Sequence, residues 1–411
     1  MSKHFLYLTD YYYPSPTSIG VCSDMIIRQL IKDGHEVDVV CFGDTANGEG
    51  IKIARNLRVF HVKDRLWERL QRSQASYKVK IGRLICRISQ FSVMYFFPMS
   101  SVSVPIRYYH LVKKIYNRNS YDEIISSYAP FEACYAACCL KKKNPDIRWS
   151  IYILDTFTNR GASKFFSEKW NDRHGWRWEK KFFPKTDKII NLRCHEKHHQ
   201  QSRYNDFRYK MYFVDIPLFD PGKFQNIETE EHDEELRFVY TGRIDSHWYS
   251  PRKMCELFWK LSEGKNWRLH FFGNPGDCRD YLAEMNRLTN GKIVMDGFVS
   301  RDRVKQEIKN ADVLVSFCHM DSDMVQSKIF DYMSTGSKIL HLTDLKYRDS
   351  AREYYKKYRN AVILDETEWN DRRRMNQIVK FLEDKEKIPI SELQILFEDN
   401  RPQTTAWILE K

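Results

Sequence analysis

Apolar residues form two patterns that alternate along the chain. Short runs of consecutive apolar positions, typical of buried parallel strands, are separated by longer stretches in which apolar residues recur at helical spacing. Near the start, a run at 5–9 is followed by a loop, a helical stretch that ends at Gly34, and a second run at 37–42. Because glycine commonly follows the last turn of a helix, this order predicts a β-α-β unit.

The same alternation continues through both halves of the chain. We predict further strands at 58–62, 123–126, 150–154, 189–192, 237–241, 268–272, 292–295, 313–317, 338–342 and 361–364. The pattern breaks near 216–222, where an acidic run follows, and this break predicts a linker. The fold class is therefore α/β, with two doubly wound Rossmann-like domains facing each other across a cleft. We place the domains at 1–215 and 236–390, the linker at 216–235, and a helical tail at 391–411 that would pack back on the first domain.

Length and composition fit this division. A chain of 411 residues with 42% apolar residues can bury two ordinary cores. The first residues lack the apolar run of a signal peptide, and the apolar stretch at 91–97 is too short to span a bilayer. Several cysteines occupy apolar periodic positions, namely Cys22, Cys41, Cys134, Cys138 and Cys318. This favours reduced, buried thiols in a cytoplasmic protein over disulfides or a metal site.

Positive charge is concentrated in one window. The net charge is +12, and residues 63–118 hold twelve basic residues against two acidic ones, with aromatic and aliphatic residues between them. A basic amphipathic insert of this kind could rest on an anionic membrane surface, or it could be a solvated basic face over an ordinary core helix. Binding of nucleic acid is a third interpretation.

The loops that follow the strands of the second half have similar features. They carry glycines or lead into helices, and the segments are Thr241-Gly242-Arg243, Gly273-Asn274-Pro275-Gly276, Gly297-Phe298-Val299 and 318–325. The last loop leads into a predicted helix that contains Lys328 and Asp331. Glycines let a backbone approach a ligand, and Arg243, Lys253 and Lys328 add positive charge near the same sheet edge. Together they predict a site for a small molecule that bears phosphate.

The order of these motifs resembles the nucleotide-binding domain of GT-B glycosyltransferases, especially the family 4 enzymes that build bacterial polysaccharides. The motifs are Gly-Arg, Gly-Asn-Pro-Gly, Gly-Phe-Val, Ala-Asp-Val-Leu-Val-Ser and Ser-Lys-Ile-Phe-Asp-Tyr-Met-Ser-Thr-Gly. The first half is similar as well, with Tyr-Pro-Ser-Pro-Thr-Ser-Ile-Gly, a helix, and Gly-His-Glu-Val. The resemblance covers most of the chain and is weaker from 44 to 121. Order and spacing carry it, because each motif alone is common.

The resemblance implies roles for individual donor-site residues. The family pattern of two glutamates separated by seven residues matches Asp323, near the donor sugar hydroxyls, and Asp331, on the nucleotide ribose. Both are one methylene shorter here. Arg243 and Lys253 match the basic pair that neutralises the diphosphate, although the spacer is longer than usual, so that Arg252 or Lys328 could substitute. The other donor-binding residues that we predict are Gly20, Gly273, Val299, Gln326 and Lys328.

Two further features belong to the first half. Asp155 directly follows the run at 150–154 and could be a catalytic base or an acceptor-binding carboxylate. The cluster His195-Glu196-Lys197-His198-His199 has two histidines at i, i+4 spacing, but a third ligand is not evident. We therefore expect an exposed polar helix there and predict no metal and no cofactor.

The sequence thus predicts an enzyme of the hexosyltransferase type that moves a sugar from a nucleotide-sugar donor to a glycan or lipid-linked glycan in surface polysaccharide synthesis. The 1–215 domain would serve the acceptor, and 63–118 would contact an anionic membrane surface, peripherally at its inner face. One alternative is a nucleotide-sugar epimerase of the same architecture. A basic nucleic-acid-binding protein, suggested by the pI near 9.0, has little motif support, so we expect no nucleic acid partner.

Overall fold

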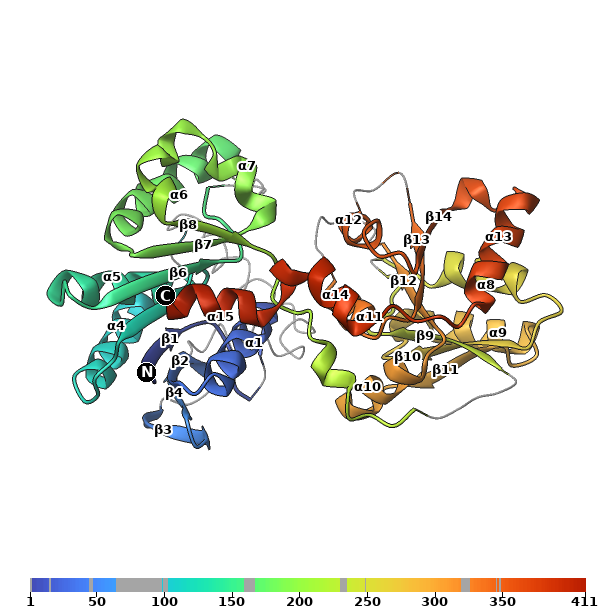
Figure 1. Cartoon of the computed structure of the whole chain (residues 1–411), viewed down its shortest axis with the longest axis horizontal. Helices are drawn as coiled ribbons and strands as arrows, with labels where there is room; N and C mark the ends of the chain where they lie inside the picture. The colour runs from blue at the N-terminus through green and yellow to red at the C-terminus, as the bar shows by residue number, and fades with distance from the viewer. Residues whose placement is uncertain are drawn as a thin grey trace, which may run out of the picture. The chain divides into compact units, whose positions relative to one another are not determined.

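The computed structural model describes two separate compact units (Figure 1). Unit 1 comprises Met1–Pro217 with Asp399–Lys411, and unit 2 comprises Leu218–Glu398. The described residues are 2–14, 16–43, 47–63, 98, 103–158, 167–229, 235–247, 249–318, 326–344, 346 and 349–411. Each unit is built on a parallel sheet with helices, which confirms the predicted α/β class with two parallel-sheet domains.

Unit 1 contains an eight-stranded sheet among its described residues, in the order β3-β4-β2-β1-β5-β6-β7-β8. Its strands are β1 (His4–Leu8), β2 (Glu36–Gly43), β3 (Asn47–Ala54), β4 (Leu57–Lys63), β5 (Glu123–Ser127), β6 (Arg148–Ile153), β7 (Lys188–Leu192) and β8 (Met211–Val214). All neighbours are parallel except β3 and β4. The strand order reverses between β1 and β5, which makes their carboxyl ends the switch point of this sheet.

Helices cover both faces of the unit 1 sheet. They are α1 (Ser18–Lys32), α4 (Ser103–Tyr116), α5 (Phe131–Lys143), α6 (Glu168–Phe182), α7 (Glu196–His199) and α15 (Pro402–Glu410), with 3-10 turns at Phe183–Lys185, Arg193–His195 and Ser202–Lys210. The core joins strand residues such as Leu6 and Val40 to Tyr108 of α4, Cys134 of α5 and Phe182 of α6. Helices α1 and α15 pack side by side (Figure 1).

Basic side chains of unit 1 hold the end of α15. Lys188 Nζ donates to the Leu409 carbonyl oxygen at 2.9 Å, and Lys3 Nζ donates to the Glu410 carbonyl oxygen. The His35 Nε2 atom lies 3.2 Å from Glu410 Oε1. Ammonium groups satisfy the terminal carbonyls of a helix and oppose the negative end of its dipole. The last helix of the chain is therefore fixed to unit 1.

Unit 2 contains six described strands, all parallel, in the order β11-β10-β9-β12-β13-β14. They are β9 (Leu236–Thr241), β10 (Trp267–Phe272), β11 (Ile293–Gly297), β12 (Val313–Phe317), β13 (Lys338–Thr343) and β14 (Ala361–Asp365). Its helices are α8 (Arg252–Leu261), α9 (Arg279–Leu288), α10 (Arg301–Asn310), α11 (Lys328–Met333), α12 (Ala351–Tyr355), α13 (Arg372–Glu383) and α14 (Ile390–Leu396), with 3-10 turns at Pro221–Phe224, Gly276–Cys278, Glu366–Glu368 and, at the border with unit 1, Glu398–Asn400. The switch point lies between β9 and β12, where ligands of such sheets bind outside the carboxyl ends.

The stretch that follows the unit boundary packs into unit 2. Phe219 and Phe224 are buried, and the Phe219 ring centroid lies 5.1 Å from that of Phe397. Asp220 caps the turn Pro221–Phe224 by accepting a hydrogen bond from the Gly222 amide at 3.1 Å. Residues 218–224, which fall in the predicted linker, therefore contribute to the core of unit 2. None of the helices in the described ranges combines the length and the apolar character needed to cross a membrane.

Candidate functional site

The carboxyl ends of β9, β10 and β11 are joined through their backbones. The Gly242 amide donates to the Phe272 carbonyl at 2.9 Å, and the Gly273 amide donates to the Gly297 carbonyl at 2.8 Å. At Gly273, which has a φ of +157°, an added Cβ would stand 1.9 Å from the Gly242 carbonyl oxygen. Only glycine fits there. The strand ends therefore meet closely, and no side chain of Gly242 or Gly273 stands between their backbone and a ligand.

Lys328, the first residue of α11, lies at the switch point of unit 2. Its Nζ donates to the Thr241 carbonyl oxygen at 3.1 Å and stands 3.5 Å from the centroid of the Tyr240 ring. The Tyr240 ring stacks on that of Phe317, with 4.5 Å between centroids. Lys328 is half-buried, and the partial loss of hydration lowers its pKa well below the ordinary value.

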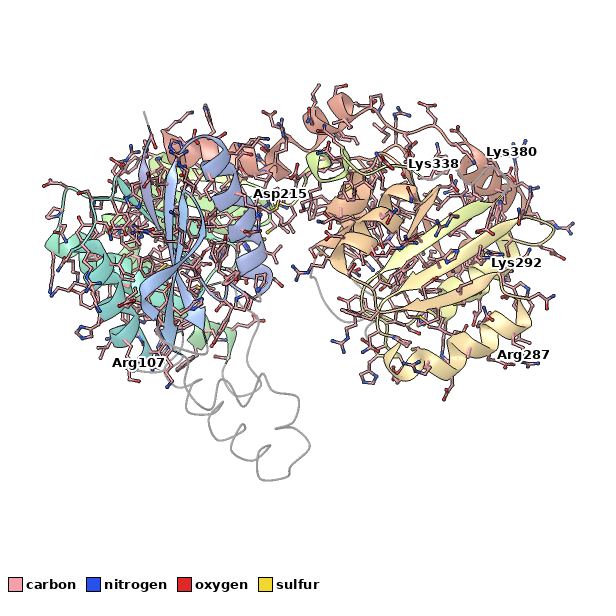
Figure 2. All side chains as sticks on the ribbon, turned by 90° about the horizontal axis from the view of Figure 1, so that it is seen from below. Arg107, Asp215, Arg287, Lys292, Lys338 and Lys380 are labelled. Carbon is pink, nitrogen blue, oxygen red and sulfur yellow. The ribbon has the colours of Figure 1, made fainter. Side chains whose placement is uncertain are left out.

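Lys328 forms no ion pair with any carboxylate of the described residues. Its neighbours are two aromatic rings and a carbonyl, which attract a cation without neutralising it. Two other lysines of unit 2, both labelled in Figure 2, have oxygen partners. Lys338 Nζ is 2.8 Å from Asp384 Oδ2, and Lys292 Nζ donates to the Ser262 carbonyl at 2.6 Å. An anion bound beside Lys328 would favour the charged form of its side chain.

Tyr332 positions α11 on the end of β9. Its hydroxyl oxygen accepts a hydrogen bond from the Thr241 amide at 2.8 Å and lies 3.1 Å from Thr241 Oγ1. The side chain is fully buried. Sequence reasoning missed this residue, although a tyrosine directly after the acidic position of the helix was a visible signal. By holding α11 in place, Tyr332 also fixes the helix backbone that carries Lys328 and Asp331.

Asp331 and Gln326 lie at the two ends of the same segment. Asp331 Oδ1 pairs with Lys223 Nζ at 3.2 Å, and both side chains remain partly exposed. Lys223 was not predicted, because it lies 108 residues away in the chain. Gln326 Nε2 donates to the Phe317 carbonyl at 3.0 Å, at the end of β12, while its buried Oε1 has no hydrogen-bond partner in the described part of the chain.

Arg243 and Lys253, the predicted basic pair, lie in different environments. The Arg243 side chain is 68% exposed, and its Nε lies 2.7 Å from Asp245 Oδ2. Lys253 Nζ lies 2.6 Å from Glu366 Oε2 and 3.2 Å from Asp344 Oδ2, and the Glu366 hydrogen bond raises the pKa of Lys253. The structure thus brings Lys328, Gln326 and Gly273 to the central strand ends, while Lys253 is held by carboxylates that follow β13 and β14.

Three predicted positions stand apart from this cluster. Val299 is half-buried and follows β11, the edge strand of the sheet. Arg252, the possible substitute, has its guanidinium 4.4 Å from the centroid of the Tyr281 ring. Asp323 lies outside the described residues, as do 64–97 and 99–102 of the predicted basic window.

In unit 1, Gly20 and Asp155 have different surroundings. A Cβ on Gly20 would stand 1.9 Å from the Tyr11 carbonyl oxygen, and the Gly20 amide already donates to Thr17 Oγ1 at 3.3 Å. Close packing within α1 and the preceding loop thus requires this glycine. Asp155 follows β6, is exposed, and forms no hydrogen bond or ion pair with another described residue.

A hydroxyl-carboxyl cluster lies beneath the loop that carries Asp155. Glu179 of α6 is fully buried and accepts hydrogen bonds from the hydroxyls of Tyr128 at 2.8 Å, Thr158 at 3.0 Å and Tyr204 at 2.8 Å. Burial raises the pKa of Glu179 despite these donors. His198 Nε2 completes the cluster at 2.7 Å from Thr158 Oγ1. The cluster fixes Thr158, three residues beyond Asp155.

The prediction of an exposed polar helix at 195–199 is wrong for His199. This side chain is 1% exposed, and its ring packs 4.9 Å from that of Tyr204. Burial lowers the pKa of His198 to about 4 and that of His199 to about 3, so both are neutral near pH 7. A neutral imidazole can pack on aromatic rings. The charged residues next to His199 in the sequence suggested an exposed helix instead. No group of three or more metal-ligating side chains forms within the described residues.

Comparison with known proteins defines the fold. No family model and no curated protein matches the sequence. Among solved structures, the lipopolysaccharide outer core galactosyltransferase WaaB shares 12% identity and a TM-score of 0.54, over 99% of this chain and 100% of that one. Anabaena HepE, solved in complex with UDP-glucose, shares 11% identity and a TM-score of 0.55, over 99% of each chain. UDP-GlcNAc 2-epimerase from Methanocaldococcus jannaschii shares 10% identity and a TM-score of 0.55, also over 99% of each chain.

These likenesses span whole chains on both sides. They show that the chain has the GT-B fold, as the motifs predicted. At identities of 10–12% they show the fold alone, and both transferases and an epimerase share it.

Proposed function

We propose that this chain is a glycosyltransferase that binds a nucleotide-sugar donor at the carboxyl edge of the unit 2 sheet. The observation that carries this proposal is Lys328, a half-buried lysine at the switch point with two aromatic neighbours and no carboxylate partner among the described residues. A diphosphate is the kind of anion that such a cation binds. The glycine-lined strand ends beside it leave room for the backbone to approach the same group.

Each donor contact follows from the chemistry of its side chain. Lys328 and the exposed guanidinium of Arg243 would neutralise the diphosphate, with Lys253 as a more distant cation held by its two carboxylates. Asp331 would accept hydrogen bonds from the ribose hydroxyls, with Lys223 fixing its carboxylate. Gln326, Gly273 and Val299 would line the pocket, and Asp323 would lie near the donor sugar. Fixed cations here stabilise the negative charge that grows on the leaving nucleoside diphosphate.

We assign the acceptor to unit 1. Asp155 is exposed at the end of β6, and its carboxylate could bind an acceptor hydroxyl or remove its proton. Gly20 would keep the loop after β1 close to the same edge. The likeness to WaaB supports a glycan or lipid-linked glycan acceptor in surface polysaccharide synthesis, with a hexose transferred. Contact of the basic 63–118 window with an anionic membrane, at the inner face of the cell membrane, belongs to the same proposal.

A nucleotide-sugar epimerase is the second candidate, because the likeness to the 2-epimerase covers the whole chain at a TM-score of 0.55. Product analysis separates the two. An epimerase converts the nucleotide sugar into its epimer without an acceptor, whereas a transferase releases nucleoside diphosphate in proportion to glycan formed. NMR of the reaction mixture reads both products. Conversion to an epimer in the absence of acceptor would reject the transferase assignment.

A further inference from the structure

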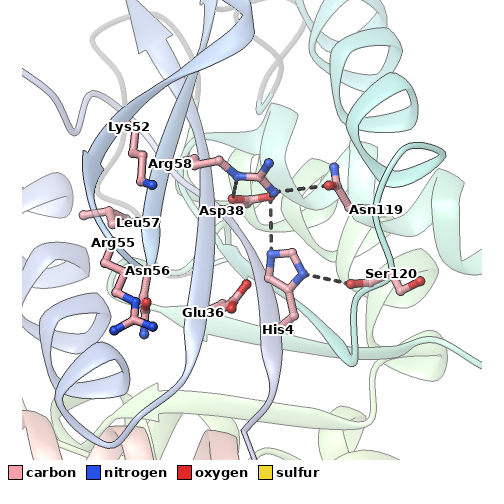
Figure 3. Close-up of a pocket in the computed structure, with 10 residues that line it drawn as sticks. All are labelled: His4, Glu36, Asp38, Lys52, Arg55, Asn56, Leu57, Arg58, Asn119 and Ser120. Atoms are coloured by element: carbon pink, nitrogen blue, oxygen red, sulfur yellow. Dashed lines mark hydrogen bonds and ion pairs between the residues drawn. The ribbon is translucent and has the colours of Figure 1, made fainter.

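A pocket of about 530 Å³ lies at the amino edge of the unit 1 sheet, and Figure 3 shows the residues that line it. Asp155 follows the carboxyl end of β6, at the opposite edge. Leu6, Val40 and Phe60 lie on one face of β1, β2 and β4 and belong to the core. Two residues earlier on each strand, the same face carries His4, Asp38 and Arg58. Because side chains of a strand alternate with period two, this face changes from apolar to charged at its amino end. The lining of the pocket is therefore polar and charged.

The floor of the pocket is a fixed arginine. Asp38 is 2% exposed and accepts two hydrogen bonds from Arg58, at 2.8 Å from Nε and 2.6 Å from Nη2. Arg58 Nη2 also donates to Asn119 Oδ1 at 3.2 Å, and the Tyr121 hydroxyl donates to Asp38 Oδ2 at 2.5 Å. This bidentate pair holds the guanidinium plane. Its remaining nitrogen, Nη1, has no hydrogen-bond partner among the described residues.

His4 adds charge to the same wall. Its Nδ1 lies 2.9 Å from the Ser120 carbonyl oxygen, and its Nε2 lies 3.4 Å from Asp38 Oδ2. Both neighbours only accept hydrogen bonds, so the geometry satisfies the imidazole when both nitrogens carry hydrogen. Burial opposes the charged form, but the hydrogen bond and the charge of Asp38 outweigh it and raise the pKa of His4.

Two more cations face the pocket from the β3–β4 hairpin. Lys52 lies on β3, and Arg55 lies in the turn that leads to β4. Both side chains are exposed and have no hydrogen bond or ion pair with any described residue. The acids of the lining are Asp38, which already pairs with Arg58, and Glu36 on the outer part of β2. The lining thus holds four basic side chains against two acids, and two of the four, Lys52 and Arg55, have no ion-pair partner among the described residues.

We propose that this pocket binds a small ligand through a doubly charged oxyanion, as in a phosphate monoester. Arg58 is oriented in advance by Asp38 and Asn119, while Lys52 and Arg55 stand free to close on the anion from the hairpin. A pocket of about 530 Å³ is of the size that holds small organic ligands, so it also accommodates the uncharged remainder of a phosphorylated sugar. This site is separate from the proposed donor site, which belongs to unit 2, and it does not depend on that proposal.

The test uses the full chain and sulfate, whose charge does not change between pH 6 and pH 9. Histidine-labelled protein is titrated with sulfate, and the His4 imidazole signals, assigned with His4→Gln, are followed by NMR. We expect saturable shifts of the His4 signals. Replacing both hairpin cations, Lys52→Ala with Arg55→Ala, should weaken sulfate binding by roughly tenfold or more, the effect of losing charge-assisted hydrogen bonds.

The matched control is Lys32→Ala, which removes an exposed cation of the same unit that does not line the pocket. Its sulfate affinity should equal that of the wild type. Absence of any His4 shift would overturn the proposal, and so would equal weakening by the control and the hairpin variants. Because the hairpin side chains are exposed, their replacement leaves the fold intact, and this is checked by thermal unfolding.

Two further experiments identify the kind of ligand and test the role of the His4 charge. Glucose 6-phosphate is compared with glucose, and vesicles of phosphatidylcholine with phosphatidic acid are compared with phosphatidylcholine alone, so that a soluble ester and a lipid headgroup are distinguished. Sulfate affinity should also fall as the pH rises through the raised pKa of His4, which faces Asp38 and Glu36 of β2, Arg58 of β4, and Tyr121 and Asp122 after α4. An affinity that does not change with pH would contradict the part assigned to His4.

Discussion

The carboxyl edges of the two sheets occupy equivalent positions in similar topologies, yet they carry opposite chemistry. In unit 2 the central strand ends present Gly242, Gly273 and the ammonium of Lys328. In unit 1 the switch point is closed by side-chain hydroxyls: Thr9 Oγ1 lies 2.9 Å from Ser23 Oγ and accepts from Ser127 Oγ at 3.2 Å. Backbone amides and cations suit phosphate, whereas the hydroxyls of Thr9, Ser23 and Ser127 are fully buried and hydrogen-bond to one another. The two edges therefore share a topology and differ in the residues that follow each strand.

Disrupting the close backbone contact at Gly273, at the carboxyl edge of the unit 2 sheet, should have the largest effect on stability. Gly273→Ala places a Cβ 1.9 Å from the Gly242 carbonyl, so the strand ends must separate, at a cost of about 3 kcal/mol or more. Gly264→Ala is the matched control, since its φ is +66° but nothing lies within 4 Å, and it should cost about 1 kcal/mol. Urea unfolding measures both. Equal losses would show that the strand ends are not tightly joined.

The contact between α11 and β9 gives the next largest effect. Tyr332→Phe leaves the buried Thr241 amide without its acceptor and should cost about 1–2 kcal/mol of stability. Donor affinity should fall roughly fivefold, since α11 carries Lys328 and Asp331. Tyr358→Phe removes a buried hydroxyl that donates to the Ser337 carbonyl at 2.8 Å, near the amino end of β13. It should lose comparable stability with unchanged donor affinity. Calorimetry of donor binding tells the two apart.

The buried acid of unit 1 makes stability depend on pH. The pKa of Glu179 is raised in the folded state, so between the unfolded and folded values the folded protein holds a proton that the unfolded chain has released. This contribution is full below the unfolded value and is lost as the pH rises through the folded value. Wild type should therefore lose stability relative to Glu179→Gln over that rise. Glu168→Gln, an exposed change on the same helix, should leave the slope as in the wild type.

Asp155 should give the smallest effect on stability. The side chain is exposed and has no described partner, so Asp155→Asn should change the free energy of unfolding by less than about 0.5 kcal/mol. Glycosyl transfer should nevertheless fall by about a hundredfold if its carboxylate acts as a base. A variant that keeps full transfer activity would remove Asp155 from the proposed mechanism and leave unit 1 without its assigned base.

Much of the fold could be predicted because parallel strands leave a clear apolar signal. The strands that were missed lack it: β3 begins with Asn-Gly-Glu-Gly, and β8 spans only Met211–Val214 at the sheet edge. Local rules also hold at helix ends, where Ser300 caps α10 by accepting a hydrogen bond from the Arg303 amide. Cys22, Cys41, Cys134, Cys138 and Cys318 are buried, as their apolar positions indicated.

The environment of the candidate site could not be predicted in the same way. That Lys253 is held by Asp344, 91 residues away, follows from how the sheet brings separate loops together. The same holds for Lys223 beside Asp331 and for the aromatic rings beneath Lys328. A sequence motif determines which residue lies at a strand end, but the charge state of that residue depends on neighbours from other strands.

The central claim is that the Lys328 edge of unit 2 binds a nucleotide sugar, and a thermal-shift screen tests it most directly. Wild type, Lys328→Met and Lys260→Met are screened against UDP-, GDP-, dTDP- and CMP-linked sugars. Lys260 is a suitable control because it is an exposed lysine of the same unit whose Nζ lies 5.5 Å from the centroid of the Trp369 ring. A ligand at a hundred times its Kd stabilises the folded state by about 2.7 kcal/mol. We predict that the nucleotide sugars of one base raise the melting temperature of wild type and of Lys260→Met. The melting temperature of Lys328→Met should change little with the same ligands. No shift with any nucleotide sugar, or the same shift in all three proteins, would contradict the account.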